Sequence, residues 1–230
     1  MTDASEEFRD EEDLPPGTGL RGRLPRRNLL RLGLIGGVVA TLLWFRRDIK
    51  YRIVVKNWGA VVPGQIYRSG QISKWLIEEQ LRSKEIDLII DMQSFNPSDP
   101  HQQHEIETAR RLGIPLERFP LRGDGTGDVS SYIDALCTLR EHETTGDKIL
   151  LHCHAGADRT GGIFYCYRTL FDGWSPAQAI AEMGNYGWYP DPGNPLIGYL
   201  NTNLAGIARA LHDRKILAEI PASLPLMPAE

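Results

Sequence analysis

The stretch from Lys148 to Leu170 constrains the fold of this chain more than any other. Residues 149–151 are apolar and, with His152, predict a short buried strand. A loop that contains Gly156 follows, and an apolar run at helical spacing begins near Thr160. The stretch therefore predicts a strand, a tight loop and a helix in direct succession.

The loop between this strand and this helix has the chemistry of an anion site. Backbone N–H groups of residues 154–159 can converge on one point, where the N-terminus of the helix adds its partial positive charge. Arg159 would supply a planar guanidinium that binds two oxygens of a tetrahedral anion. A free cysteine thiol titrates at about 8.5, and such surroundings favour the thiolate. We therefore expect Cys153 to be a nucleophile, with Thr160 donating a hydrogen bond to its sulfur.

Two segments of the chain resemble one superfamily. The motif His152-Cys153-x5-Arg159-Thr160-Gly161 resembles the phosphate-binding signature of the cysteine-dependent protein tyrosine and dual-specificity phosphatases. The segment Val62–Gln71, which reads VPGQIYRSGQ, is similar to the entry segment of their compact, atypical dual-specificity-like branch of bacterial type, which also has fungal and plant members. Arg68 in this segment either holds the phosphate loop or braces its own strand, and we favour bracing.

The resemblance implies roles for the residues of the loop. Cys153 and Arg159 would be catalytic, and the residues between and just after them would form the phosphate-binding loop: His154, Ala155, Gly156, Ala157, Asp158 and Thr160. The chemistry needs no metal and no other cofactor. The tripeptide Asp91-Met92-Gln93 stands where this branch usually has Asp-Leu-Arg, so a charge expected beside the site is missing.

The resemblance also implies a general acid, because a departing alcohol or phenolate needs a proton and a mobile loop about 30 residues before the nucleophile supplies it. In the polar loop 121–128, Asp124 lies 29 positions before Cys153 and Asp128 lies 25 before it. We favour Asp124, although Asp residues also commonly serve Gly-rich turns. Asp158 is a second candidate, since Cys-x4-Asp-Arg-Thr is similar to the pattern of myotubularin-like and some bacterial lipid phosphatases.

We expect an α/β fold with a central, mostly parallel sheet of about four or five strands and helices on both faces, as in dual-specificity phosphatases. The catalytic domain is predicted to span residues 50–215 and to begin with two short strands over residues 51–56 and 65–67. Residues 216–230 are expected to be a C-terminal tail, loose over its last part. With 230 residues, 41% of them hydrophobic, the chain fits one such domain plus extensions.

Composition excludes some classes of function. A net charge of −4 does not indicate the basic surface that nucleic-acid binding requires. Three cysteines at these spacings make no disulfide framework, so a catalytic thiolate is the better use of one of them.

The N-terminal residues predict a tail and an anchor. Residues 1–28 are acidic and then basic, and we expect them to be disordered. Residues 29–46 predict a hydrophobic helix whose span of about 26 Å approaches the roughly 30 Å of a bilayer core. We favour a single-pass anchor in a bacterial inner membrane, with a surface-lying helix or a buried helix as alternatives. Similar numbers of basic residues flank both ends, so the side of the catalytic domain is undecided. Gly33 and Gly37 would allow weak dimerisation of the anchor.

The expected function is phosphomonoester hydrolysis through a phosphocysteine, most simply by a membrane-tethered protein tyrosine or dual-specificity phosphatase. The partner would be a phosphorylated protein or a phospholipid. Relatives that cleave phosphoinositides often carry Lys inside the loop, and its absence here favours phosphotyrosine. The anchor and Asp158 favour the alternative, a phosphoinositide or lipid phosphatase. An inactive phosphate-binding module is the alternative of another class, and a sulfurtransferase or arsenate reductase fits less well.

Overall fold

The structure, a computed structural model, describes residues 34, 36–43, 50, 52–191 and 193–228. The chain divides into two units, residues 1–45 and residues 46–230. In the first unit, residues 34 and 36–43 are helical and carry exposed apolar side chains such as Leu34 and Leu42. The predicted tail over residues 1–28, and much of the predicted anchor over residues 29–46, lie outside the described residues. Within the described part of the chain, no helix has both the length and the apolar character needed to cross a bilayer.

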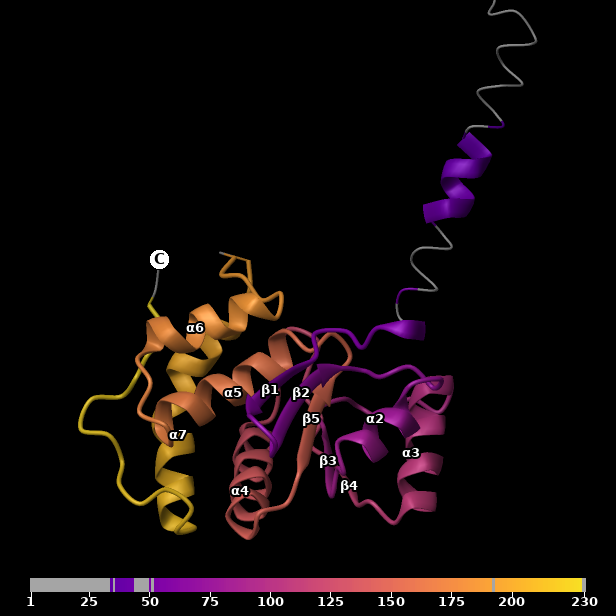
Figure 1. Ribbon diagram of the computed structural model, residues 1–230. Coiled ribbons are helices and arrows are strands. Elements are labelled where there is room, and N and C mark those ends of the chain that lie inside the picture. Colours follow the sequence, from indigo (N-terminus) through magenta and orange to yellow (C-terminus); the bar gives the residue numbers. More distant parts are fainter. Residues whose placement is uncertain (1–33, 35, 44–49, 51, 192, 229–230) are drawn as a thin grey trace, which may run out of the picture. The chain divides into compact units, whose positions relative to one another are not determined.

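The second unit is built on a five-stranded sheet with the strand order β1-β2-β5-β3-β4 (Figure 1). The strands are β1 (Gly59–Val62), β2 (Ile66–Gly70), β3 (Leu88–Asp91), β4 (Leu116–Arg118) and β5 (Ile149–Cys153). β1 runs antiparallel to β2, and the remaining neighbours are parallel. The predicted mostly parallel sheet is therefore confirmed, and β5 is its central strand.

Helices cover both faces of this sheet (Figure 1). The helices on one side are α2 (Ile77–Ser83) and α3 (Pro100–Leu112), and those on the other side are α4 (Val129–Thr145), α5 (Asp158–Leu170), α6 (Pro176–Asn185) and α7 (Leu196–Asp213). Successive side chains of a strand point to opposite faces. Leu150 of β5 accordingly packs with α2 and α3, whereas Leu151 and Cys153 belong to the larger core on the other side.

One predicted strand is wrong. The sequence placed the first strand at residues 51–56, but it lies at Gly59–Val62. Residues 52 and 53 are helical, and Asn57 has a φ of 47°. Asn is one of the few residues other than glycine that adopt this left-handed conformation readily. The chain therefore turns at Asn57 before it enters the sheet.

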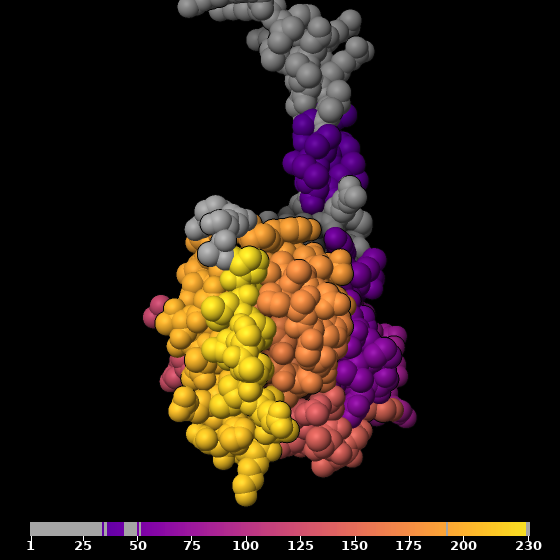
Figure 2. All heavy atoms as spheres, turned by 90° about the vertical axis from the view of Figure 1, so that its left-hand side faces the viewer, coloured from indigo at the N-terminus to yellow at the C-terminus, as the bar shows by residue number. Residues whose placement is uncertain are grey.

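The residues after α7 pack against the domain instead of forming a loose tail. The Asn201 side chain exchanges two hydrogen bonds with the backbone of Met227, at 2.9 and 2.8 Å. The Tyr165 hydroxyl donates to the Pro225 carbonyl at 2.6 Å. Figure 2 shows the C-terminal residues, in yellow, as a band across this face. We call residues 221–228 the C-terminal strap. Its backbone is held by side chains of α5 and α7, although its prolines had suggested a loose tail.

Candidate active site

The predicted phosphate-binding loop, residues Cys153–Arg159, lies at the C-terminal end of the central strand. Cys153 ends β5, and Arg159 lies in the first turn of α5. The Cys153 side chain is 1% exposed, and the backbone N–H of Gly156 donates to its Sγ at 3.1 Å. The predicted succession of strand, loop and helix is present, and it places a thiol and a guanidinium at one helix N-terminus.

Four successive carbonyls of this loop are held by donors outside the anion site. His154 O accepts from Gln71 N–H at 3.2 Å, Ala155 O from Asn57 Nδ2 at 2.9 Å, Gly156 O from Arg68 at 3.0 Å, and Ala157 O from Gly161 N–H at 2.6 Å. Because the peptide unit is planar, a carbonyl turned outward turns the next N–H inward. The N–H groups of residues 155–158 therefore face the interior of the loop, where they can bind a phosphoryl oxygen.

Arg68 of β2 lies beneath the loop and is fully buried. Besides its bond to Gly156, its guanidinium stacks on the Tyr186 ring, 3.9 Å from the ring centroid. Burial lowers the pKa of Arg68 to about 10, so the group is charged at neutral pH. The structure gives Arg68 the loop-holding role, which was the alternative that the sequence analysis did not favour.

Two donors in the first turn of α5 lack partners among the described residues. The Thr160 hydroxyl and the Arg159 Nε are both buried and make no hydrogen bond there. The expected bond from Thr160 to the Cys153 sulfur is therefore not formed in this structure. A guanidinium with a free Nε–H beside a ring of inward N–H groups suits an oxyanion.

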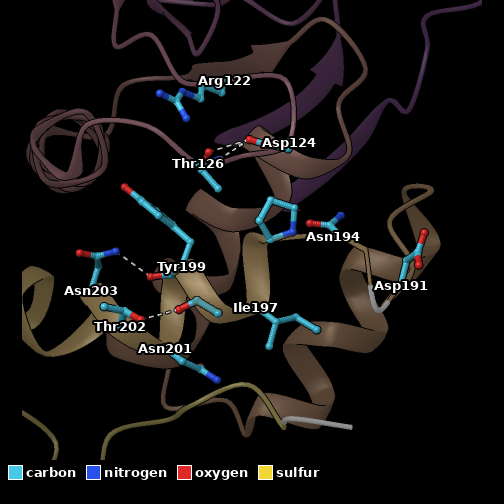
Figure 3. A pocket seen from close by; sticks show the side chains of 12 residues that line it. Arg122, Asp124, Thr126, Asp191, Asn194, Ile197, Tyr199, Asn201, Thr202 and Asn203 are labelled. Carbon is cyan, nitrogen blue, oxygen red and sulfur yellow. Dashed lines mark hydrogen bonds between the residues drawn. The ribbon is translucent and has the colours of Figure 1, made fainter.

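The loop that carries Asp124 packs against the start of α5. Asp124 Oδ1 accepts from the backbone N–H and the hydroxyl of Thr126, at 2.9 and 2.8 Å (Figure 3). The first of these bonds is the main reason why the pKa of Asp124 is lowered. A Cβ on the next residue, Gly125, would lie 3.3 Å from the Asp158 backbone. Asp124 immediately precedes Gly125, whose backbone lies close to that of Asp158 at the start of α5.

The other two acid candidates have different surroundings. Asp158 Oδ1 accepts from Asn194 Nδ2 at 3.0 Å, and Asn194 Oδ1 accepts from Leu196 N–H at 2.9 Å, so Asn194 orients the carboxylate. Asp128 caps α4 by accepting from Ser130 N–H at 2.9 Å, and this bond lowers its pKa. Asp128 therefore has a structural role, which leaves Asp124 and Asp158 beside the site. The sequence carries no signal that would have singled out Asn194.

A cavity of about 1000 Å³ opens beside Asp124. Figure 3 shows Arg122, Asp124 and Thr126 on one side and residues at the start of α7, including Ile197 and Tyr199, on the other. None of residues 153–159 lines the cavity, which approaches the loop only through Asp124 and through Asn194, the partner of Asp158.

A buried cluster of charged side chains lies behind the loop, on the α3 side of the sheet. His152 Nε2 is 3.1 Å from Glu105 Oε1, and His152 Nδ1 is 3.9 Å from Asp91 Oδ1. Arg118 of β4 pairs with the other oxygen of Asp91 at 2.9 Å. Burial by itself would lower the pKa of His152, but the Glu105 and Asp91 charges outweigh it and raise the pKa to about 9. Arg118 is thus a positive charge that the next strand brings into this cluster.

Among proteins of known structure, this fold is that of the cysteine-based tyrosine and dual-specificity-like phosphatases, as the sequence resemblance implied. SIW14 of S. cerevisiae, a PP-IP phosphatase, superposes with a TM-score of 0.58 at 21% identity, covering 72% of this chain and 96% of the other. TpbA of P. aeruginosa gives 0.54 at 20% identity, with 68% and 91% covered. PTPMT1 gives 0.53 at 13% identity, with 68% and 99% covered. No protein-family model and no curated protein matches the chain in sequence.

Proposed function

We propose that this protein hydrolyses phosphomonoesters through a covalent phosphocysteine. The observation that carries the proposal is the loop itself: four carbonyls are held outward, so that the N–H groups of residues 155–158 turn toward the interior of the loop that begins at Cys153. Donors fixed in advance around developing charge are the main source of catalysis in such sites.

The reaction proceeds in two displacements. The Cys153 thiolate attacks phosphorus, the bond from phosphorus to the leaving oxygen breaks, and a carboxylic acid gives that oxygen its proton. Water then attacks the phosphocysteine, which releases inorganic phosphate and restores the thiolate. Asp124 is the proposed acid because it borders both the loop and the cavity, and Asp158 is the alternative.

A protein phosphotyrosine is the proposed substrate. The loop holds no Lys or Arg between Cys153 and Arg159, and its one charged side chain there is acidic, so it offers nothing extra to a second phosphate group. A solved TpbA variant was crystallised in complex with pTyr, at a TM-score of 0.52 with this chain. The alternative is a phosphoinositide or other lipid phosphatase, and SIW14, a PP-IP phosphatase, shows that this fold is not restricted to one class of substrate.

The test compares Cys153→Ser with Cys137→Ser, whose thiol lies on α4 away from the loop. Initial rates are measured without added metal on a phosphotyrosine peptide, a phosphothreonine peptide and mono- and bis-phosphorylated phosphoinositides. Cys153→Ser should bind the tyrosine peptide but not turn it over, and Cys137→Ser should behave as the wild type. Turnover by Cys153→Ser would exclude the covalent mechanism, and faster cleavage of a lipid would replace the tyrosine assignment. An absence of turnover by the wild type on all substrates would support a phosphate-binding module.

We also propose that residues 29–46 tether the enzyme to a membrane. The described helical residues 34 and 36–43 carry exposed apolar side chains: Leu34, Val38, Leu42 and Leu43. Exposed apolar side chains on one short helix favour a lipid environment. Extraction of cell membranes with alkaline carbonate tests this: the full chain should stay in the pellet, and a soluble chain would contradict the tether.

A further inference from the structure

The cluster behind the loop is formed by side chains from three strands of the sheet and from helix α3. Asp91 ends β3, Glu105 lies on α3, Arg118 ends β4 and His152 lies on β5 immediately before Cys153. Asp91, Glu105 and His152 are each at most 1% exposed. No sequence motif indicated Glu105, whose neighbours on α3 are mostly polar.

The two nitrogens of His152 face two different carboxylates. Nε2 is 3.1 Å from Glu105, and Nδ1 is 3.9 Å from Asp91. Neither His152 nitrogen makes a hydrogen bond within the described part of the chain, so these contacts are electrostatic. A neutral imidazole would place a lone pair toward carboxylate oxygens, whereas the imidazolium places a positive charge between two carboxylates. The geometry therefore favours the charged ring.

Charge balance supports the same protonation state. With His152 protonated, the formal charges of the two buried carboxylates are cancelled by His152 and by Arg118, which is 18% exposed. With His152 neutral, two buried carboxylates share only Arg118, a state that burial makes costly. The residue paired with His152 on β2 is the uncharged Ser69, and a thiolate at Cys153 would favour the imidazolium.

We propose that Glu105 is a positioning residue for the proposed phosphatase reaction: it keeps His152 as a buried cation, which stabilises the negatively charged sulfur of Cys153. The raised pKa of His152 agrees with this role. The same three side chains, Asp91, Glu105 and His152, are spaced like metal ligands. A divalent ion would displace the proton from His152 and leave an excess positive charge beside Arg118, so the proton is the simpler occupant.

The experiment measures the alkylation of Cys153 by iodoacetamide as a function of pH in the full-length protein, with the modified peptide followed by mass spectrometry. Alkylation needs no substrate, so its result is independent of whether the proposed function holds. In Glu105→Gln, the pH at which alkylation reaches half of its maximal rate should rise by about one unit. At pH values below that midpoint, the variant should therefore be alkylated about tenfold more slowly than the wild type. Glu105→Asp retains the charge and should restore most of the wild-type curve.

Glu143→Gln is the matched control, because Glu143 is a mostly buried carboxylate paired with Arg140 and Tyr167, remote from the loop. It should keep the wild-type curve. A folded Glu105→Gln protein with the wild-type curve would overturn the proposal. If Glu105→Gln does not fold, nitrogen NMR of the wild-type histidines decides: a neutral His152 at pH 7, or a stoichiometric metal ion in the purified protein, would also overturn it.

Discussion

Gly156→Ala should damage the phosphate-binding loop much more than the same change at another left-handed glycine. Gly156 has a φ of 74°, and Gly146, at the C-terminus of α4, has a φ of 87°. An alanine in this conformation costs about 1–2 kcal/mol. A Cβ at Gly146 meets nothing within 4 Å, so Gly146→Ala carries this cost alone.

At Gly156 a second cost is added. Its Cβ would lie 2.5 Å from the Gly70 nitrogen, and the backbone must separate by about 0.9 Å to regain an ordinary contact of 3.4 Å. Such a shift carries the Gly156 carbonyl away from Arg68, and a buried hydrogen bond to a charged group contributes about 1.5–3 kcal/mol. We therefore expect Gly156→Ala to lower the free energy of unfolding by about 3–5 kcal/mol.

Urea unfolding followed by circular dichroism measures both variants, and hydrolysis of a phosphotyrosine peptide measures function. A displacement of about 1 Å at a catalytic loop costs about 100-fold in rate. Gly156→Ala should show that loss, and Gly146→Ala should keep the wild-type rate. Equal destabilisation of the two variants, or an active Gly156→Ala enzyme, would refute the reasoning that β2 shapes the loop.

Three further predictions concern the acid, the buried histidine and the C-terminal strap. Asp124→Asn should slow hydrolysis of phenyl phosphate but spare p-nitrophenyl phosphate, whose leaving group needs no proton; the same split in Asp158→Asn alone would make Asp158 the acid. The pKa of His152 is raised from 6.5 to about 9 on folding, so its stabilising contribution is complete below pH 6.5 and is lost as the pH rises through 9. Urea midpoints across that range should fall, and a rise would contradict this assignment. Asn201→Ala should destabilise the domain by about 1–2 kcal/mol and speed proteolysis of the strap without changing the rate of hydrolysis.

The succession of strand, loop and helix could be predicted because its signals are local. Strand, loop and helix follow one another within Lys148–Leu170, and the residues that carry the chemistry lie inside that stretch. The mostly parallel sheet could be predicted for a similar reason, since continuous apolar runs such as Leu88–Ile90 suit strands covered on both faces.

The groups that hold the loop were harder to predict, because each reaches it from far along the chain; Asn57 was missed, and the role of Arg68 was only the less favoured of two alternatives. Asn57 and Arg68 bond to loop carbonyls that lie 98 and 88 positions later in the sequence. Arg118 reaches Asp91 only through the register of β3 and β4. The strand wrongly placed at residues 51–56 has a different, local cause. The apolar run there gives no sign that the backbone turns at Asn57 before the strand begins.

The outward bonds of the loop carbonyls have a consequence for how the proposed active site forms. Asn57, Arg68 and Gln71 are synthesised long before Cys153, and contacts over such separations form late, because a long loop must close first. A chain in which only the local strand and helix have formed would hold a thiol and an arginine without an oriented ring of N–H groups. Phosphatase activity should therefore appear only when the N-terminal and central strands have joined, which makes turnover a reporter of completed folding.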